Sequence, residues 1–313
     1  MTLEDSNNAI CELVTVRDWL RYGTSRFRAA HLVFGHGTST ALDEAAFLIL
    51  SALDLPIDVL DPWLDCRLTQ SERKRISALF EARISTRKPA PYLVNRAYIR
   101  GHGFYVDERV IVPRSYIGEL LDTELTTVVP DLETVTTVLD LCTGSGCLAI
   151  LAALTYPNAV IDAVDLSVDA LAVASRNVSE YGLQDRITLH QSDLFSALDS
   201  RRYDLILSNP PYVSAGAIAD FPPEYRAEPV MAHRGGYDGL DLVRRILSDA
   251  PQYLERDGVL VVEVGTALDI LEEEYPNLPF LWLDTEDSSG EVFALTAGEL
   301  GAGNRAEGRN RQR

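Results

Sequence analysis

Apolar side chains recur at helical spacing through residues 1–92 of the chain. One stripe follows Ser39-Thr40, which we expect to cap its helix, and another stripe runs over residues 71–85. The pair Lys88-Pro89 then ends the pattern, because a proline disfavours the helical conformation in the residue before it. Stripes of this kind more often build a core than a cofactor site, so the pattern predicts a small helical domain.

From residue 137 onward the pattern changes to short, mostly apolar runs separated by helical stretches. Such runs, bounded by polar residues, are typical of buried strands. Strands that alternate with helices predict an α/β fold with a mainly parallel, Rossmann-like sheet. The runs that predict the seven strands are 137–141, 160–164, 187–190, 203–208, 259–264, 280–282 and 292–295.

The region between these patterns predicts a connector. Residues 97–106 and 109–112 alternate as in a β-hairpin with its turn near Asp107-Glu108. The tail is rich in glycine and arginine, a composition that predicts disorder. The predicted organisation is a helical domain (1–92), a hairpin and linker (93–136), a sheet domain (137–296) and a disordered tail (297–313).

The sequence Asn209-Pro210-Pro211-Tyr212 follows the fourth predicted strand. In an open α/β sheet, ligands bind outside the carboxyl ends of the strands. The two prolines fix φ and remove two backbone donors, so they form a stiff turn that presents carbonyl oxygens, one amide and one ring. This turn is suited to hold a planar NH2 group. The alternative is a strand-ending turn in which Asn209 is a cap.

A glycine-rich loop, Cys142-Thr143-Gly144-Ser145-Gly146, lies between the first strand and a predicted helix over 147–154. Glycines there let a ligand approach the backbone near the helix N-terminus. Because Ala149 stands where a dinucleotide fingerprint tolerates alanine, this loop alone leaves a nicotinamide site open. Asp165 follows the second strand and Asp193 the third. A helix cap is the alternative for Asp165 and a turn residue for Asp193.

Together these four elements resemble the class I S-adenosylmethionine-dependent methyltransferases. The resemblance implies that the loop from Asp140 to Gly146 wraps the methionine part of S-adenosyl-L-methionine. It implies that Asp165 holds the ribose and that Asp193 with Leu194 contacts the adenine. It also implies that Leu166 and Asn209 bind the cofactor.

The helical domain, hairpin and Asn-Pro-Pro-Tyr turn together resemble the protein N(5)-glutamine methyltransferase family. Residues 104–115 and 221–240 are closer to its ribosomal branch, which implies a glutamine of the third large-subunit ribosomal protein as substrate. The alternative is a release factor, although that branch usually has Pro-Arg-Pro where this chain has Pro113-Arg114-Ser115. Tyr116 stands where some ribosomal-branch members have a proline. This difference bears on the choice between the two branches and does not change the expected reaction.

The chemistry assigned to the turn is positioning. Oδ1 of Asn209 and the carbonyl of Pro210 accept the two N–H bonds of the substrate amide, while Tyr212 packs on it and excludes water. Positioning of this kind supplies up to roughly 7–11 kcal/mol of barrier reduction. We expect Pro211 and Phe104 of the hairpin to border the same substrate pocket, the helical domain to recognise the substrate, and no metal to take part.

Composition fits two domains and a cytoplasmic chain. The 313 residues are roughly twice a typical domain, and no apolar run reaches the length of about 18 residues that a membrane helix needs. The first residues do not form a signal-peptide pattern. Four cysteines without Cys-x-x-Cys spacing fit a reducing compartment, and five scattered histidines do not form a metal-ligand pattern.

The charge of the chain is concentrated in its sheet region. Residues 91–296 hold 13 Lys and Arg against 33 Asp and Glu, a net of −20 within a total of −19. This charge repels duplex nucleic acid and disfavours the nearest alternative reaction, adenine-N6 methylation of DNA. It attracts a basic partner, such as a ribosomal protein, free or in an assembling large subunit. The alternative is that acidity only maintains solubility. A third hypothesis, an inactive binding module, is disfavoured by the intact motifs.

Overall fold

The structure, a computed structural model, describes residues 3–121, 124–129, 131–285 and 288–302. The chain divides into two compact units. A helical unit comprises Met1–Glu108 together with Phe221–Glu228, and a sheet unit comprises Arg109–Asp220 and Pro229–Arg313. The hairpin therefore folds with the helices, residues 109–136 fold with the sheet, and a short segment of the predicted sheet domain belongs to the helical unit. These boundaries differ from the predicted ones.

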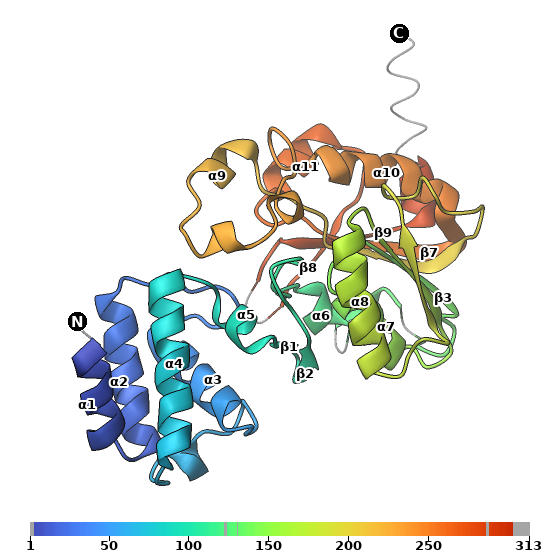
Figure 1. Cartoon of the computed structure of the whole chain (residues 1–313). Coiled ribbons are helices and arrows are strands. Elements are labelled where there is room, and N and C mark those ends of the chain that lie inside the picture. Colours follow the sequence, from blue (N-terminus) through green and yellow to red (C-terminus); the bar gives the residue numbers. More distant parts are fainter. Residues whose placement is uncertain (1–2, 122–123, 130, 286–287, 303–313) are drawn as a thin grey trace. The chain divides into compact units, whose positions relative to one another are not determined.

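The helical unit has a bundle of four main helices, drawn in blue to cyan in Figure 1. Threonines cap three of these helices: Thr40 caps α3 as predicted, while Thr15 and Thr69 each form a capping box at the start of α2 and α4. The helix predicted over 71–85 is confirmed as α4. The elements are α1 (Leu3–Glu12), α2 (Val16–Ala29), α3 (Ala41–Ala52), η1 (Asp61–Trp63), α4 (Gln70–Thr86), α5 (Ala90–Val94), β1 (Ala97–Ile99), β2 (His102–Phe104) and η3 (Tyr225–Ala227).

Aromatic rings fill the core of this bundle. Phe80 lies 5.1 Å from Phe27 and 6.1 Å from Trp19, measured between ring centroids, and the three side chains are buried. Each such ring buries a large apolar area, so the predicted stripes do build a core.

The hairpin predicted between residues 97–106 and 109–112 is wrong, and a shorter hairpin lies within residues 97–104 instead. Strands β1 and β2 pair antiparallel around Arg100 and Gly101, which have φ of 51° and 79°. Two left-handed residues match the twist of a two-residue hairpin, and glycine accepts such a φ without strain. Residues 109–112, which the alternation predicted to be the second strand, are not in a strand.

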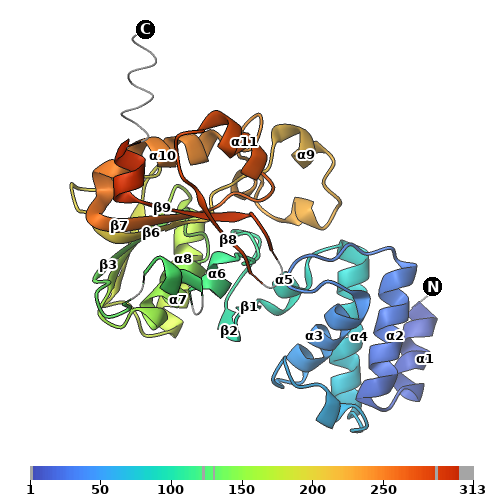
Figure 2. The ribbon, with the colours of Figure 1, turned by 180° about the vertical axis from the view of Figure 1, so that it is seen from behind.

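The sheet unit contains the predicted seven-stranded sheet in the order β5-β4-β3-β6-β7-β9-β8. All neighbouring strands are parallel except at β9, which runs antiparallel to β7 and β8. Seen from behind, β6, β7 and β9 lie side by side (Figure 2). The strands are β3 (Thr137–Leu141), β4 (Val160–Asp165), β5 (Ile187–Gln191), β6 (Tyr203–Ser208), β7 (Leu254–Glu263), β8 (Leu281–Leu283) and β9 (Val292–Thr296).

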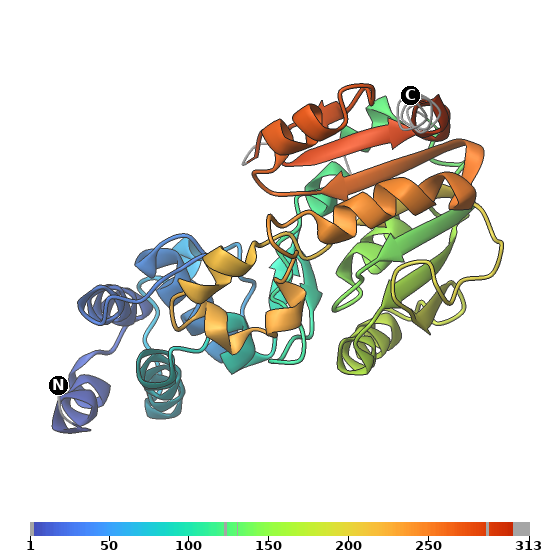
Figure 3. The ribbon, with the colours of Figure 1, turned by 90° about the horizontal axis from the view of Figure 1, so that it is seen from above.

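Helices cover both faces of this sheet. In Figure 1, α10 and α11 lie above the sheet and α6, α7 and α8 lie below it, and Figure 3 shows α10, in orange, lying along the strands. Buried side chains of α10 pack on strand residues such as Leu139, Ile206 and Leu260. The helical elements are α6 (Ile117–Leu120), η2 (Glu124–Thr127), α7 (Cys147–Thr155), α8 (Val168–Glu180), α9 (Ala215–Ala219), η4 (Val230–Ala232), α10 (Asp241–Tyr253) and α11 (Leu268–Glu274).

The strand register brings the predicted motifs to one edge. Leu141, the last residue of β3, pairs with Val164 of β4 on one side and with Ser208 of β6 on the other. Asp165 pairs with Gln191 at the end of β5. The chain order reverses at β3, and ligands of open α/β sheets bind at such a switch point, outside the carboxyl ends of the strands.

The tail differs from its prediction in part. Residues 297–302 are helical and Leu300 is buried in the sheet core, because its apolar side chain packs there. Residues 303–313 lie outside the described residues. Within the described part of the chain, no helix combines the length and apolarity needed to cross a membrane.

Candidate active site

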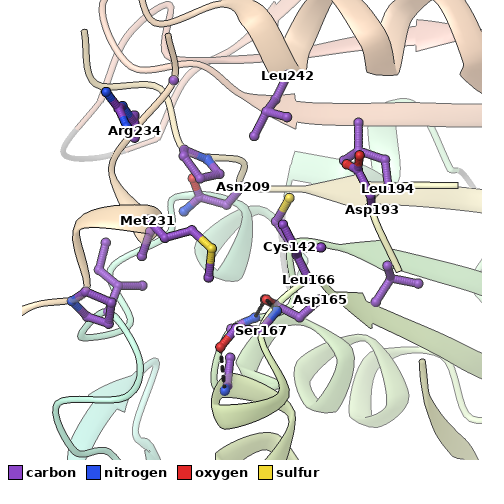
Figure 4. Close-up of a pocket in the computed structure, with 18 of the residues that line it drawn as sticks. Cys142, Asp165, Leu166, Ser167, Asp193, Leu194, Asn209, Met231, Arg234 and Leu242 are labelled. Atoms are coloured by element: carbon purple, nitrogen blue, oxygen red, sulfur yellow. Dashed lines mark hydrogen bonds between the residues drawn. The ribbon is translucent and has the colours of Figure 1, made fainter. Parts of the chain in front are cut away.

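A cavity of about 740 Å³ lies at this edge of the sheet, within the sheet unit. Its volume is in the range of small-molecule and cofactor sites. Figure 4 shows Asn209 and Met231 on its left and Asp193 with Leu194 on its right. Eight predicted site residues line it: Cys142, Gly144, Asp165, Leu166, Asp193, Leu194, Asn209 and Pro211.

The side chain of Asp140 stabilises the glycine-rich loop. This side chain is fully buried, and its Oδ2 accepts hydrogen bonds from the hydroxyl of Thr143 and from the backbone N–H of Ala149, the latter at 3.0 Å. Burial raises the pKa of Asp140 to about 7. Asp140, Thr143, Ser145 and Gly146 are not among the described residues that line the cavity. They shape the loop, and Cys142 and Gly144 are the loop residues that face the cavity.

Asp165 lies at the end of β4 and joins three parts of the site. Its Oδ2 accepts the backbone N–H of Gly144 at 2.9 Å, and its Oδ1 accepts that of Ser167 at 2.8 Å. Burial raises its pKa, while these two hydrogen bonds oppose the rise. The hydroxyl of Ser167 caps α8, so Asp165 is not needed as the N-cap. The remaining lone pairs of Asp165 suit hydroxyl donors such as those of a ribose.

Asp193 and Leu194 form the opposite side of the cavity. Oδ1 of Asp193 lies 3.0 Å from Nη2 of Arg245, in an ion pair whose side chains are about half exposed. The pair raises the pKa of Arg245. Leu194 is buried in the sheet core and has a left-handed φ of 51°. An apolar wall beside a partly solvated acid suits a flat heterocycle with polar edges.

The Asn-Pro-Pro-Tyr turn begins directly after β6. Ser208, the last strand residue, donates its hydroxyl to the carbonyl of Leu141 at 3.0 Å, which fixes the turn against β3. Among the described residues, neither the side chain of Asn209 nor the carbonyl of Pro210 takes part in a hydrogen bond. Asn209 lies at the cavity wall, where a polar side chain without a protein partner is available to a ligand.

The Tyr212 hydroxyl is engaged away from the cavity. It donates to Oε1 of Glu263 at 3.2 Å, and burial together with the charge of Glu263 raises the pKa of the phenol. Glu263 has no exposed surface, and its burial raises its own pKa to about 7. Tyr212 and Pro210 do not belong to the cavity lining in the described chain. Tyr212 therefore supports the turn in this structure.

Phe104, which we predicted to border the substrate pocket, is wrongly assigned. Its side chain has no exposed surface, and it is not among the described residues that line the cavity. A fully buried ring does not offer a face to a substrate. The alternation of residues 97–106 did not show which face of the hairpin is covered.

Residues after the turn complete the cavity, as we expected of the loop that follows Tyr212, although the individual side chains were not predicted. Met231 and Arg234 lie beside Asn209 in Figure 4, and both are exposed. The sequence signal is the run between Pro229 and Gly236, which contains two glycines and follows the turn closely. The further lining residues are Arg109, Val110, Ile111, Val164, Ser167, Ala170, Ser192, Pro229, Val230, Met231, Ala232, Arg234, Gly235, Gly236, Asp241, Leu242 and Arg245.

Curated relatives match nearly the whole chain. The ribosomal protein uL3 glutamine methyltransferase of Bradyrhizobium diazoefficiens is 56% identical, over 92% of each chain. The protein of the same name in Bordetella pertussis is 54% identical, over 94% of this chain and 99% of the other. The chain belongs to this family. The resemblance inferred from the motifs is thereby confirmed, and so is the prediction of an S-adenosylmethionine-dependent methyltransferase.

Two further comparisons agree with this assignment. A family model described as "Methyltransferase small domain" matches residues 119–221, which include the glycine-rich loop and the Asn-Pro-Pro-Tyr turn. The catalytic domain of hMettl16, solved with an MAT2A 3′UTR hairpin, aligns with a TM-score of 0.51 at 16% identity. That alignment covers 72% of this chain and 81% of that chain. It supports the class I methyltransferase fold.

Proposed function

We propose that this methyltransferase transfers a methyl group from S-adenosyl-L-methionine to the side-chain amide nitrogen of a glutamine in ribosomal protein uL3. The observation that carries the proposal is Asn209 at the cavity wall, where the described residues supply no hydrogen-bond partner to its side-chain amide. The names of the relatives support uL3 over a release factor or DNA.

The residues of the cavity fit the cofactor. Asp165 offers free lone pairs at the end of β4, and Asp193 lies beside the buried side chain of Leu194. Gly144 has no atom within 4 Å of where a Cβ would stand, so the loop leaves open space on the cavity side. We assign the ribose to Asp165 with Leu166, the adenine to Asp193 with Leu194, and the methionine part to the loop.

The reaction depends more on the orientation of the amide nitrogen than on general acid or base catalysis. When bound, S-adenosyl-L-methionine would supply an electrophilic methyl group, with its sulfur as the leaving atom in a neutral thioether. The amide nitrogen would release one of its two protons after the transfer. Oδ1 of Asn209 and the carbonyl of Pro210 accept the two N–H bonds of the glutamine amide and fix its plane. Tyr212 and Pro211 hold the turn rigid, so the nitrogen keeps one orientation. Fixed geometry of this kind lowers the barrier by up to roughly 7–11 kcal/mol.

The charge of the sheet region supports a basic protein substrate. Residues 91–296 carry a net charge of −20, and such a field raises the association rate of a cationic partner. We propose that the enzyme binds uL3 either as the free protein or within an assembling large subunit. Either form places the reaction in the cytoplasm. We assign substrate recognition to the helical unit, and we do not expect duplex DNA to be a substrate.

Methyl transfer from cofactor labelled with tritium in its methyl group tests the proposal. We expect label on purified uL3, and none on the uL3 variant whose methylated glutamine, found by mass spectrometry, is replaced by alanine. Release factor and duplex DNA are assayed in parallel at equal concentration. Faster labelling of release factor or DNA than of uL3 would overturn the substrate assignment.

A further inference from the structure

A short segment beyond the Asn-Pro-Pro-Tyr turn folds with the helical unit. Residues Phe221–Glu228 pack with the N-terminal helices, although the chain on either side of them belongs to the sheet unit. The residues that follow immediately, from Pro229 to Ala232, line the cavity. The chain therefore passes from the turn into the helical unit and then directly into a wall of the active site.

Glu224 is the centre of this attachment. Its side chain has no exposed surface. Its Oε1 accepts the backbone N–H of Val33 at 3.0 Å and lies 2.8 Å from Nη2 of Arg87 and 3.5 Å from Nη1 of Arg83. Separating a buried carboxylate from its cationic partners has a high free-energy cost, because each charge is then left unpaired away from water. This contact therefore holds the segment in one place.

The two arginines come from the end of α4 and are held by further contacts. Arg83 is fully buried; its Nε donates to Oε1 of Glu44 at 2.7 Å and its Nη2 to the carbonyl of Val33 at 2.9 Å. Arg87 donates to the carbonyls of residues 30 and 31. Both guanidinium groups are thus held by contacts other than Glu224 and present a cationic site to its carboxylate.

Rings and a second acid fix the rest of the segment. The ring of Tyr225 lies 4.4 Å from the ring of His36 and 5.3 Å from that of Phe221, measured between centroids. At the end of the segment, Oε2 of Glu228 lies 3.5 Å from Nε2 of His36, and both side chains are buried. The last residue before the cavity wall is therefore packed inside the helical unit as well.

Hydrogen bonds carry this anchorage to the turn. The backbone N–H of Ala232 donates to Pro229 at 2.9 Å, which closes the turn of η4. The carbonyl of His233 then accepts the N–H of Val213 at 2.8 Å, and Gly235 donates to Val213 at 2.9 Å. Val213 directly follows Tyr212, so the cavity wall and the Asn-Pro-Pro-Tyr turn form one hydrogen-bonded loop.

We propose that Glu224 is a positioning residue for methyl transfer, because it holds Phe221–Glu228, the segment that directly precedes the cavity-lining residues Pro229–Ala232, in one conformation. This role rests on the proposed function only for its effect on the rate.

Hydrogen exchange of the full-length chain, followed by mass spectrometry, tests the anchorage without any substrate. In Glu224→Gln we expect the amides of residues 230–235 to exchange about tenfold faster or more, while those of β6 and α10 stay unchanged. Tyr225→Ala removes a ring contact without leaving a buried charge, so it is a second variant that keeps the fold. We expect it to act in the same direction with a smaller effect.

The matched control is Glu81→Gln. It removes the 2.8 Å pair between Arg26 and Glu81, which also belongs to α4 but does not involve the segment. We expect the control to leave residues 230–235 protected and the single-turnover rate on uL3 unchanged. For Glu224→Gln we expect that rate, at saturating cofactor and uL3, to fall about 10- to 100-fold.

Two results would overturn the proposal. One is faster exchange in α1–α4 with no change at residues 230–235, since Glu224 would then only stabilise the helical unit. The other is a native single-turnover rate in a variant whose residues 230–235 are deprotected. If the native protein does not methylate uL3 at all, the proposed function fails, whereas the exchange result for the anchorage still stands.

Discussion

The hydroxyl of Tyr212 donates a hydrogen bond to Oε1 of Glu263 over 3.2 Å. The second oxygen of Glu263 accepts from the hydroxyl of Ser115 at 2.6 Å and from the backbone N–H of Tyr116 at 3.0 Å. One buried carboxyl group therefore joins the Asn-Pro-Pro-Tyr turn to the segment that follows Pro113. Gly265 packs on the same ring: its φ is +56°, and an added Cβ would lie 2.9 Å from the ring of Tyr212.

Removal of the phenol hydroxyl tests this link. In Tyr212→Phe we expect the ring to stay in place and cofactor affinity to hold, while the single-turnover rate falls about tenfold because the turn loses one restraint. The control is Tyr203→Phe at the other end of β6, which removes a 2.9 Å hydrogen bond to Asp162. It should reduce stability by about 1 kcal/mol and leave the rate unchanged. Equal rates in both variants would show that the hydroxyl of Tyr212 has no part in positioning.

Glu263 should make stability depend on pH. Its pKa in the folded state is raised to about 7 by burial, above its ordinary value of 4.5. Between these values the unfolded chain loses the proton and the folded chain keeps it, so stability falls as pH rises to about 7 and is flat beyond. In Glu263→Gln we expect the fall in unfolding free energy between pH 4.5 and 7 to shrink by about 3 kcal/mol. Urea unfolding at a series of pH values measures it.

Asp140 should add its own pH dependence of stability in the same experiment. Its pKa is also raised to about 7 by burial, so it contributes a fall of the same sign over the same range. A residual slope in Glu263→Gln is therefore expected. A slope identical to that of the native chain would mean that Glu263 is ionised in the folded protein at pH 4.5.

Asn209 should separate methyl transfer from cofactor binding. Asn209→Ala removes the acceptor for the substrate amide, so we expect transfer to fall by orders of magnitude with cofactor affinity nearly intact. Asn209→Asp keeps an acceptor but adds charge in an acidic domain, and we expect a rate between those of Ala and Asn. Single-turnover rates at saturating cofactor decide the order. Native transfer by the Ala variant would make the turn purely structural.

Asp165 should contribute to cofactor affinity. We expect Asp165→Ala to weaken S-adenosylmethionine binding by roughly 1–3 kcal/mol in calorimetry, the cost of unpairing a buried polar group. The matched control is Asp204→Asn. Asp204 lies near the start of β6, at the edge of the sheet away from the cavity, and its carboxylate accepts hydrogen bonds from the backbone N–H groups of Thr136 and Thr137. This change should lower stability and leave affinity as it is. If the Asp165→Ala variant bound the cofactor as tightly as the native protein, the role of Asp165 would be limited to its hydrogen bonds with Gly144 and Ser167.

The acidic charge should steer the substrate. If the net charge of −20 over residues 91–296 attracts uL3, the association rate should fall steadily as salt rises, because the screening length shortens to about 3 Å at 1 M. Stopped-flow association at increasing KCl measures this dependence. A rate independent of salt would leave solubility as the role of the acidity.

Local sequence decided the elements and the chemistry. Stripes at helical spacing and threonine caps such as Thr40 specified the bundle, because caps and periodicity act within one turn of the chain. Short apolar runs specified seven strands, and Asp165, Asp193 and Asn209 follow three of them. Parallel strands share one carboxyl edge, so their order in the sequence was enough to predict that these side chains meet.

Tertiary structure alone decided which groups support the site. Glu263 reaches Tyr212 and Ser115, and Glu224 reaches Arg83 and Arg87, across sequence distances that carry no periodic signal. The same limit explains Phe104, whose alternating pattern predicted a hairpin but not that its ring is buried. A buried carboxyl group looks like any surface acid in a sequence, because only the packing of distant elements removes it from water and raises its pKa.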